Sequence, residues 1–152
     1  MIRLWLFLHL LGFTLWLGGA IAAMIMGIAA KREDRHGLGA VVRAQASVMK
    51  VAIAPGAVIT VLSGLILTFS ATAVLNEVAG FNIWLLTMQG AGFIAALLTL
   101  LISLPTAAKL SRLDPSGEAA GYFDELRQRQ RIVASISGTF GLIALFAGGM
   151  LS

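Results

Sequence analysis

Hydrophobic residues fall into four long stretches separated by shorter polar segments. The stretches run from residue 2 to 30, from about 48 to 73, from 81 to 104 and from about 132 to 151. Each is near or above the ~20 residues that a helix needs to cross the ~30 Å hydrocarbon core of a bilayer. None alternates with a period of two, and an open sheet cannot satisfy its backbone in lipid, so the pattern predicts four helices.

Details of the four stretches refine this prediction. Arg3 followed by an apolar run and small residues is typical of a signal peptide, but the run continues to Ala30 and therefore predicts a first membrane span. Pro55 lies in the first turns of the second stretch, where it can kink the helix. Pro105 is expected to mark the end of the third helix.

Composition agrees with this arrangement. The 152 residues are 59% hydrophobic and 12% charged, whereas soluble domains are about 45–50% apolar and about 25% charged. We therefore expect an all-α, integral membrane four-helix bundle that forms a single transmembrane domain over residues 1–152 and has the lipid bilayer as its surroundings. The net charge of +4 does not predict a nucleic-acid partner, because the basic residues cluster beside apolar stretches. The chain has no cysteine, which excludes disulfides, thiolate metal sites and cysteine nucleophiles.

The distribution of basic residues predicts the orientation. All lysines and arginines except Arg3 lie in or beside the first and third connections: Lys31, Arg32, Arg35, Arg43, Lys50, Lys109, Arg112, Arg127, Arg129 and Arg131. The second connection, residues 72–80, carries only Glu77 as a charged residue. Because short cytoplasmic loops are rich in lysine and arginine, the first and third connections should face the cytoplasm, and both termini should lie on the outer, periplasmic side.

A short cytoplasmic helix is expected at about residues 115–131, before the fourth span. Asp114 followed by Pro115 is typical of a helix start. Asp124 lies three residues before Arg127, and Glu125 four residues before Arg129, which are stabilising spacings on a helix.

One face of the first span carries unusual residues. Steps of three and four along the helix bring onto one side Trp5, His9, Gly12, Trp16, Gly19, Ala23 and Gly27. Small residues mark helix contacts in lipid, so this face should point into the bundle. Similar rows occur in the other spans: Trp84, Met88, Ala91, Ala95 and Leu98; Gly56, Thr60 and Gly64; Ala134, Gly138 and Gly141. The matching Trp5-x3-His9 and Trp84-x3-Met88 indicate a two-plus-two repeat about an axis along the membrane normal.

His9 is the main candidate for chemistry, because no other ionisable residue lies deep in a predicted span. Its imidazole could ligate haem iron or copper with Met88 as the second ligand, and Trp5, Gly12 and Trp16 would then pack around the site. In the alternative interpretation, a neutral His9 donates a hydrogen bond to a backbone carbonyl or to Thr14, Thr87 or Gln89. Both interpretations remain open at the level of sequence. No span carries paired carboxylates, and no metalloprotease, phosphate-loop or nucleophile-elbow motif is present.

Short motifs resemble a group of four-helix bacterial membrane proteins. They are Leu8-His9-Leu10-Leu11-Gly12, Leu15-Trp16-Leu17-Gly18-Gly19, Pro55-Gly56, Ser63-Gly64-Leu65 and Trp84. The group comprises the CopD-type copper-resistance proteins, the HemJ-type protoporphyrinogen oxidases and a branch of uncharacterised predicted integral membrane proteins, to which this chain is most similar. The resemblance implies a multi-pass protein of the bacterial inner membrane, with His9 as a haem-associated residue. The oxidases have a Tyr-Leu-Pro-Arg stretch and a lysine where this chain has Ala22-Ala23-Met24-Ile25 and Met88, so their enzyme activity does not carry over.

Two classes of function follow from these residues. In the first, a small membrane protein binds haem b or copper through His9 and takes part in redox or metal handling. In the second, a cofactor-free accessory subunit packs its small-residue faces against another copy, as a homodimer, or against the other membrane subunits of a larger complex.

Overall fold

The computed structural model describes residues 2–74 and 82–151, with side chains omitted at 71–74. The first long helix is α1 (Ile2–Ala29), followed by a 3-10 turn (Ala30–Arg32); the second joins α2 (Arg35–Val48), a π-helical segment η2 (Met49–Ile53) and α3 (Ala54–Val74). The third joins α4 (Ile83–Leu97), a π-helical segment η3 (Leu98–Ser103) and α5 (Leu104–Leu110), and the fourth is α6 (Ala120–Gly149). All four helices of the described residues are long and apolar enough to cross a membrane. This result confirms the predicted all-α membrane architecture.

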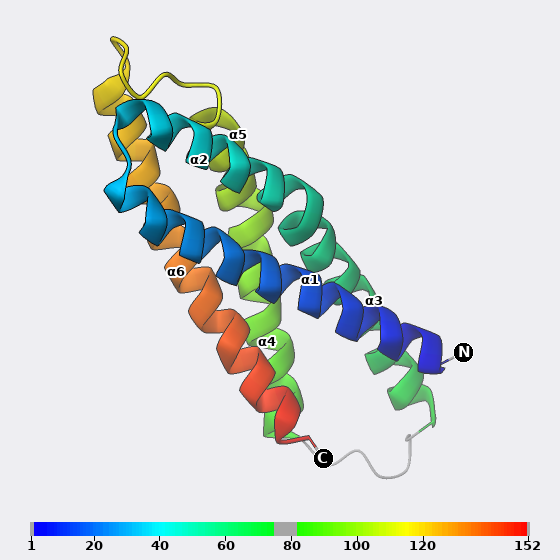
Figure 1. The fold of residues 1–152 in the computed structure, drawn as a ribbon. Helices are drawn as coiled ribbons and strands as arrows, with labels where there is room; N and C mark the ends of the chain where they lie inside the picture. Colours follow the sequence, from blue (N-terminus) through cyan, green and yellow to red (C-terminus); the bar gives the residue numbers. More distant parts are fainter. Residues whose placement is uncertain (1, 75–81, 152) are drawn as a thin grey trace.

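The four helices are arranged as two closely packed pairs. Helix α1 packs along α3, and α4 packs along α6, whereas contacts between the pairs are fewer (Figure 1). The pairs come together where α2 and α5 lie and spread apart toward the other end. Each pair therefore consists of spans that are consecutive in sequence, as the two-plus-two pattern predicts.

Glycines bring α1 and α3 into very close contact. A Cβ atom on Gly12 would lie 2.9 Å from the carbonyl oxygen of Gly56, and one on Gly56 would lie 2.7 Å from the carbonyl oxygen of Gly12. Further along the pair, a Cβ on Gly19 would lie 2.8 Å from Cγ1 of Ile53. Only glycine permits this backbone separation, so the small-residue face of the first span points inward as predicted.

The α4–α6 pair combines aromatic and hydroxyl contacts. The rings of Trp84 and Phe146 meet edge to face, with centroids 6.0 Å apart. Deeper in the pair, the hydroxyls of Thr99 and Ser137 lie 2.8 Å apart, and Ser137 Oγ donates to the carbonyl of Ala95 at 3.0 Å. Because lipid offers no hydrogen-bond partner, these hydroxyls must be satisfied inside the pair.

The third helix does not end at Pro105, and this corrects the sequence-based expectation. In η3, the N–H of Leu104 bonds to the carbonyl of Thr99, five residues back, and the helix then continues through Pro105 to Leu110. In η2, the N–H of Ala54 bonds to the carbonyl of Met49 in the same way, directly before Pro55. A proline clashes with the carbonyl four residues back in a regular α-helix. The wider π-turn before each proline accommodates its ring, so neither helix breaks.

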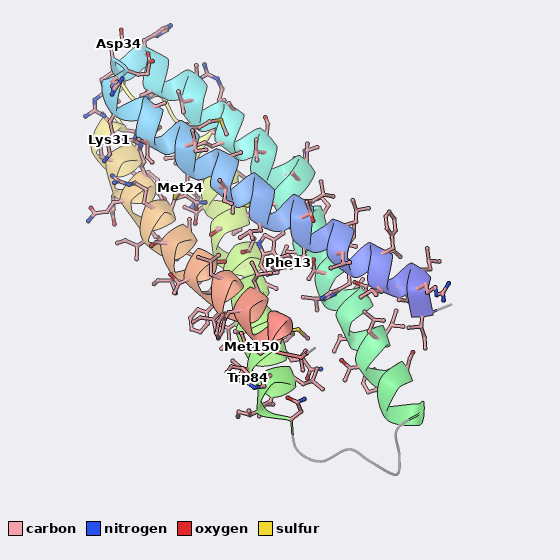
Figure 2. All side chains as sticks on the ribbon, turned by 60° about the horizontal axis from the view of Figure 1, so that its bottom comes forward. Phe13, Met24, Lys31, Asp34, Trp84 and Met150 are labelled. Atoms are coloured by element: carbon pink, nitrogen blue, oxygen red, sulfur yellow. The ribbon has the colours of Figure 1, made fainter. Side chains whose placement is uncertain are left out.

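The end of the molecule that contains α2, α5 and the start of α6 is called the basic end. It has its own apolar core, which consists of Ala30, Leu38, Val42, Leu110, Phe123 and Leu126. Lys31 and Asp34 lie at this end and Trp84 and Met150 at the opposite end (Figure 2). Core packing thus extends beyond the apolar stretches into the segments that carry most of the charge.

An ion pair joins two distant segments at the basic end. The guanidinium of Arg35 donates two hydrogen bonds to the carboxylate of Asp124, at 2.9 and 2.8 Å. This hydrogen bonding, with the positive charge of Arg35, holds the pKa of Asp124 below its usual value. Asp124 therefore hydrogen-bonds to a residue 89 positions away, and the positive charge of Arg127, its predicted neighbour on the helix, also helps to lower its pKa.

The start of the fourth helix also differs from the prediction. Asp114 does not cap a helix; its side chain accepts from the backbone N–H of Ser116 in a turn, and α6 begins only at Ala120. From there one unbroken helix runs to Gly149, so the polar segment after Ala120 is an extension of the fourth span. Most of the second connection and the start of the third stretch, residues 75–81, lie outside the described residues.

Candidate functional site

His9 lies on the inner face of α1, against α3. Its Nδ1 donates a hydrogen bond to the carbonyl oxygen of Thr60 at 2.9 Å. Because a carbonyl oxygen can only accept, this bond requires a proton on Nδ1, and in the neutral tautomer with that proton the lone pair is on Nε2. The structure thus places the His9 side chain as a hydrogen-bond donor to a backbone carbonyl of the neighbouring helix.

The surface of α3 is shaped to receive the imidazole ring. A Cβ on Gly64 would lie 2.9 Å from Cε1 of His9, so the absence of a side chain at this position makes room for the ring. Ser63 Oγ lies 3.3 Å from His9 Nδ1 and accepts a second, longer hydrogen bond from it. Thr60 in turn donates its hydroxyl to the carbonyl of Gly56 at 2.7 Å. One face of α3 therefore fixes both the position and the tautomer of His9.

The second ring nitrogen has a different environment. His9 Nε2 has no hydrogen-bond partner among the described residues, and it is not one of their fully buried unpartnered atoms. The ring as a whole is half-buried. The described residues therefore do not enclose Nε2 completely.

A chain of polar groups continues from this site to α4. Gln89 Nε2 donates to Thr68 Oγ1 at 2.6 Å, and Thr68 Oγ1 donates to the carbonyl of Gly64 at 2.9 Å. Gly64 is the residue on which the His9 ring lies. Polar side chains near His9 thus join the two helix pairs through α3 and α4.

Met88 lies in the other helix pair. Its Sδ would be 3.2 Å from a Cβ on Gly148, so the thioether packs on α6. The two Trp-x3 motifs therefore share a structural feature: His9 packs on a glycine of the second span, and Met88 packs on a glycine of the fourth. The structure brings His9, Gly12 and Trp16 together at the contact with α3, whereas Met88 contacts α6 and Trp5 is half-buried on α1.

Two residues of the second span that the sequence pattern predicts as packing residues belong to the His9 site. Thr60 and Gly64 belong to the small-residue row of the second span, and the structure shows that this row contacts His9. Ser63 lies one residue outside the row and is recognisable only from its place in the Ser-Gly motif. The spacing of four between Gly56, Thr60 and Gly64 was the available signal, because it places all three on one helical face.

The donor set for a metal is narrow. In the described part of the chain, no group of three or more His, Asp or Glu side chains is placed to hold a metal ion. The bundle itself offers His9 Nε2, a single neutral imidazole nitrogen. This arrangement is chemically suited to an axial ligand of haem iron or to one position of a copper centre.

Comparisons with family models, curated proteins and solved structures gave no match to the chain. The architecture nevertheless defines its class, which is a multi-pass helical membrane protein.

Proposed function

We propose that the protein is a small membrane protein that binds haem b or copper through His9 Nε2 and takes part in redox or metal handling. The observation that carries this proposal is that His9 Nδ1 donates to the carbonyl of Thr60, the bond that the cofactor-free interpretation also predicts, while Nε2 has no partner among the described residues. Metal-ligating histidines nearly always donate their other ring N–H to a carbonyl or carboxylate, which orients the ring and makes the free nitrogen more basic. His9 has this arrangement, and Nε2 is not completely enclosed by the described residues.

The chain's own residues would contribute orientation and surroundings. Thr60, Ser63 and Gly64 hold the ring against α3. The bound group would supply electron transfer or metal storage. Met88 is the proposed second ligand, and its flexible side chain would have to leave its contact with Gly148 to reach the same centre.

An absorption spectrum of the detergent-purified protein, together with a metal analysis, tests this proposal. We expect a Soret band or bound copper in the wild type, and its loss in His9→Ala. The matched control is His36→Ala, because His36 is the only other histidine and is exposed at the basic end. Met88→Leu tests whether Met88 is the second ligand. A shifted spectrum supports ligation by its sulfur, and an unchanged spectrum shows that another group is the second ligand. A colourless, metal-free wild type, purified after haem and copper supplementation, contradicts the proposal.

A second candidate function is that of a cofactor-free accessory subunit. Its support is that some small residues of the spans have no close neighbour among the described residues: a Cβ on Gly18, Gly90 or Gly138 would meet none of their atoms within 4 Å. Small residues in lipid often mark contacts with another helix. Co-purification of a metal-free protein with a defined set of membrane subunits, or as a homodimer, would favour this function over the first.

The resemblance to the CopD- and HemJ-type group also stands as a proposal, and with it the location in a bacterial inner membrane. The porphyrinogen oxidase activity is not part of it, because the Tyr-Leu-Pro-Arg stretch and the lysine are missing. The orientation proposed here has the basic end in the cytoplasm and both termini on the periplasmic side.

A further inference from the structure

A groove at the basic end separates α2 and η2 from α5. Its cavity measures about 340 Å³ and is lined by both walls: Arg43, Ser47 and Lys50 on one side, and Leu104, Ser111 and Arg112 on the other. Arg43, Ser47 and Lys50 follow one another at steps of four and three, so they share one helical face. The groove has no part in the His9 site, which lies between α1 and α3.

The charged residues that line the groove are all positive. Three of its lining residues are cations, Arg43, Lys50 and Arg112, and none is a carboxylate. All three side chains are exposed. Within the described residues, the one side-chain ion pair is that between Arg35 and Asp124, so none of these three cations is neutralised by a carboxylate there. Such a concentration of positive charge attracts an anionic group.

The groove lies where the charged end meets the apolar surface. Val51, the residue after Lys50, is 75% exposed, and Ala108, which lines the groove, is exposed as well. In a membrane these apolar side chains would contact acyl chains, while the cations directly beside them would lie at the level of the head groups. The lining of the groove also includes apolar side chains, those of Ala46, Leu104 and Ala108. A ligand that fits both surfaces has an anionic head and an apolar tail.

We propose that this groove binds the head group of an anionic phospholipid, with Arg43, Lys50 and Arg112 contacting its phosphate and its acyl chains lying over Val51. Basic pockets between membrane-spanning helices are known to hold such head groups. The lipid would link α2 to α5, and so connect the two helix pairs at the basic end. This proposal is independent of whether His9 binds a cofactor.

Titration of the full-length protein in zwitterionic detergent tests the proposal, with bound lipid counted by native mass spectrometry. We expect phosphatidylglycerol to bind at least tenfold more tightly than phosphatidylcholine. In the triple variant Arg43→Gln/Lys50→Gln/Arg112→Gln the affinity for phosphatidylglycerol should fall by on the order of a hundredfold and the preference should disappear, because each basic group near the head groups contributes about fivefold. Inorganic phosphate should not displace the lipid at millimolar concentration, since it lacks the apolar part.

A second triple variant serves as the matched control. Lys31→Gln/Arg32→Gln/Arg131→Gln removes the same charge from exposed residues that do not line the groove, and it should retain the preference. Equal loss in both variants, equal binding of the two lipids by the wild type, or full displacement by phosphate would overturn the proposal. If the groove variant does not fold, Arg112→Gln alone is measured, and an affinity within twofold of the wild type then counts against the site.

Discussion

Glycine at two residue positions determines how closely α1 approaches α3. We expect Gly12→Ala and Gly56→Ala each to lower the free energy of unfolding by about 1–3 kcal/mol, the usual cost of overpacking. The new Cβ would lie 2.9 Å from a backbone oxygen at position 12 and 2.7 Å from one at position 56, and backbone cannot move aside as a side chain can. Thermal or denaturant unfolding in detergent measures the effect. Gly18→Ala is the control, because its Cβ would meet nothing within 4 Å; equal destabilisation by all three would contradict the interpretation.

Removal of the hydroxyl from two buried serines should change the stability of the protein in different ways. Ser137 Oγ donates to the carbonyl of Ala95 and bonds to Thr99, so Ser137→Ala should cost roughly 0.6–1.7 kcal/mol, as interhelical hydrogen bonds in membrane proteins do. Ser103 is 2% exposed, and its Oγ has no hydrogen-bond partner in the part of the chain that the structure describes. Ser103→Ala should therefore leave stability unchanged or raise it, since it removes an unsatisfied polar atom. A loss of stability in Ser103→Ala, measured by the same unfolding assay, would reveal a partner for this hydroxyl.

At the residue scale, sequence reasoning identified the positions but not their hydrogen bonds. The inward face of the first span followed from steps of three and four, and the structure confirms it at Gly12 and Gly19. The bond from His9 to the carbonyl of Thr60 was one of several open possibilities. A backbone carbonyl carries no sequence signature, so periodicity could not single out Thr60.

Among the elements, the basic end has a core that does not depend on lipid. Phe123 is 0% exposed and packs with Leu38, Leu110 and Leu126. We expect Phe123→Ala to cost about 3–5 kcal/mol, the range for deleting a buried aromatic ring. Its neighbour Tyr122 is 44% exposed, so Tyr122→Ala should cost much less. Hydrogen exchange of α2 and the start of α6 would show whether the loss is local, and similar effects of both variants would contradict a core at this end.

The helical segments around Pro55 and Pro105 show how far element boundaries can be predicted. A proline removes one donor and clashes with the preceding turn, so a helix end at Pro105 was the natural expectation. The structure instead widens the preceding turn into η3 and continues the helix. Whether a proline ends or only distorts a helix depends on the packing of neighbouring helices. Here Thr99 and Ser103 of η3 are both buried, and this tertiary contact is not encoded locally.

For the whole molecule, four apolar stretches were sufficient to predict four membrane-length helices, because the thickness of the bilayer fixes their length. The pairing of consecutive spans was suggested by two Trp-x3 motifs and agrees with the close α1–α3 and α4–α6 contacts. The Arg35–Asp124 pair was not foreseeable, since it joins residues whose proximity depends on how the two helix pairs meet. Long-range contacts of this kind arise from the assembled bundle and not from any one segment.

The orientation of the whole molecule can be tested directly, because the chain contains no cysteine. Single cysteines at exposed positions 116 and 150 report the basic end and the opposite end, respectively. In intact spheroplasts, a membrane-impermeant maleimide should label Met150→Cys, and it should label Ser116→Cys only after lysis. The physical reason is that lysine and arginine residues near span ends remain in the cytoplasm during insertion. All lysine and arginine residues except Arg3 lie in or beside the first and third connections. A permeant maleimide must label both variants, and neither maleimide should label the wild type. Labelling of Ser116→Cys alone before lysis would invert the proposed orientation and would place the three cations of the lipid groove in the outer leaflet.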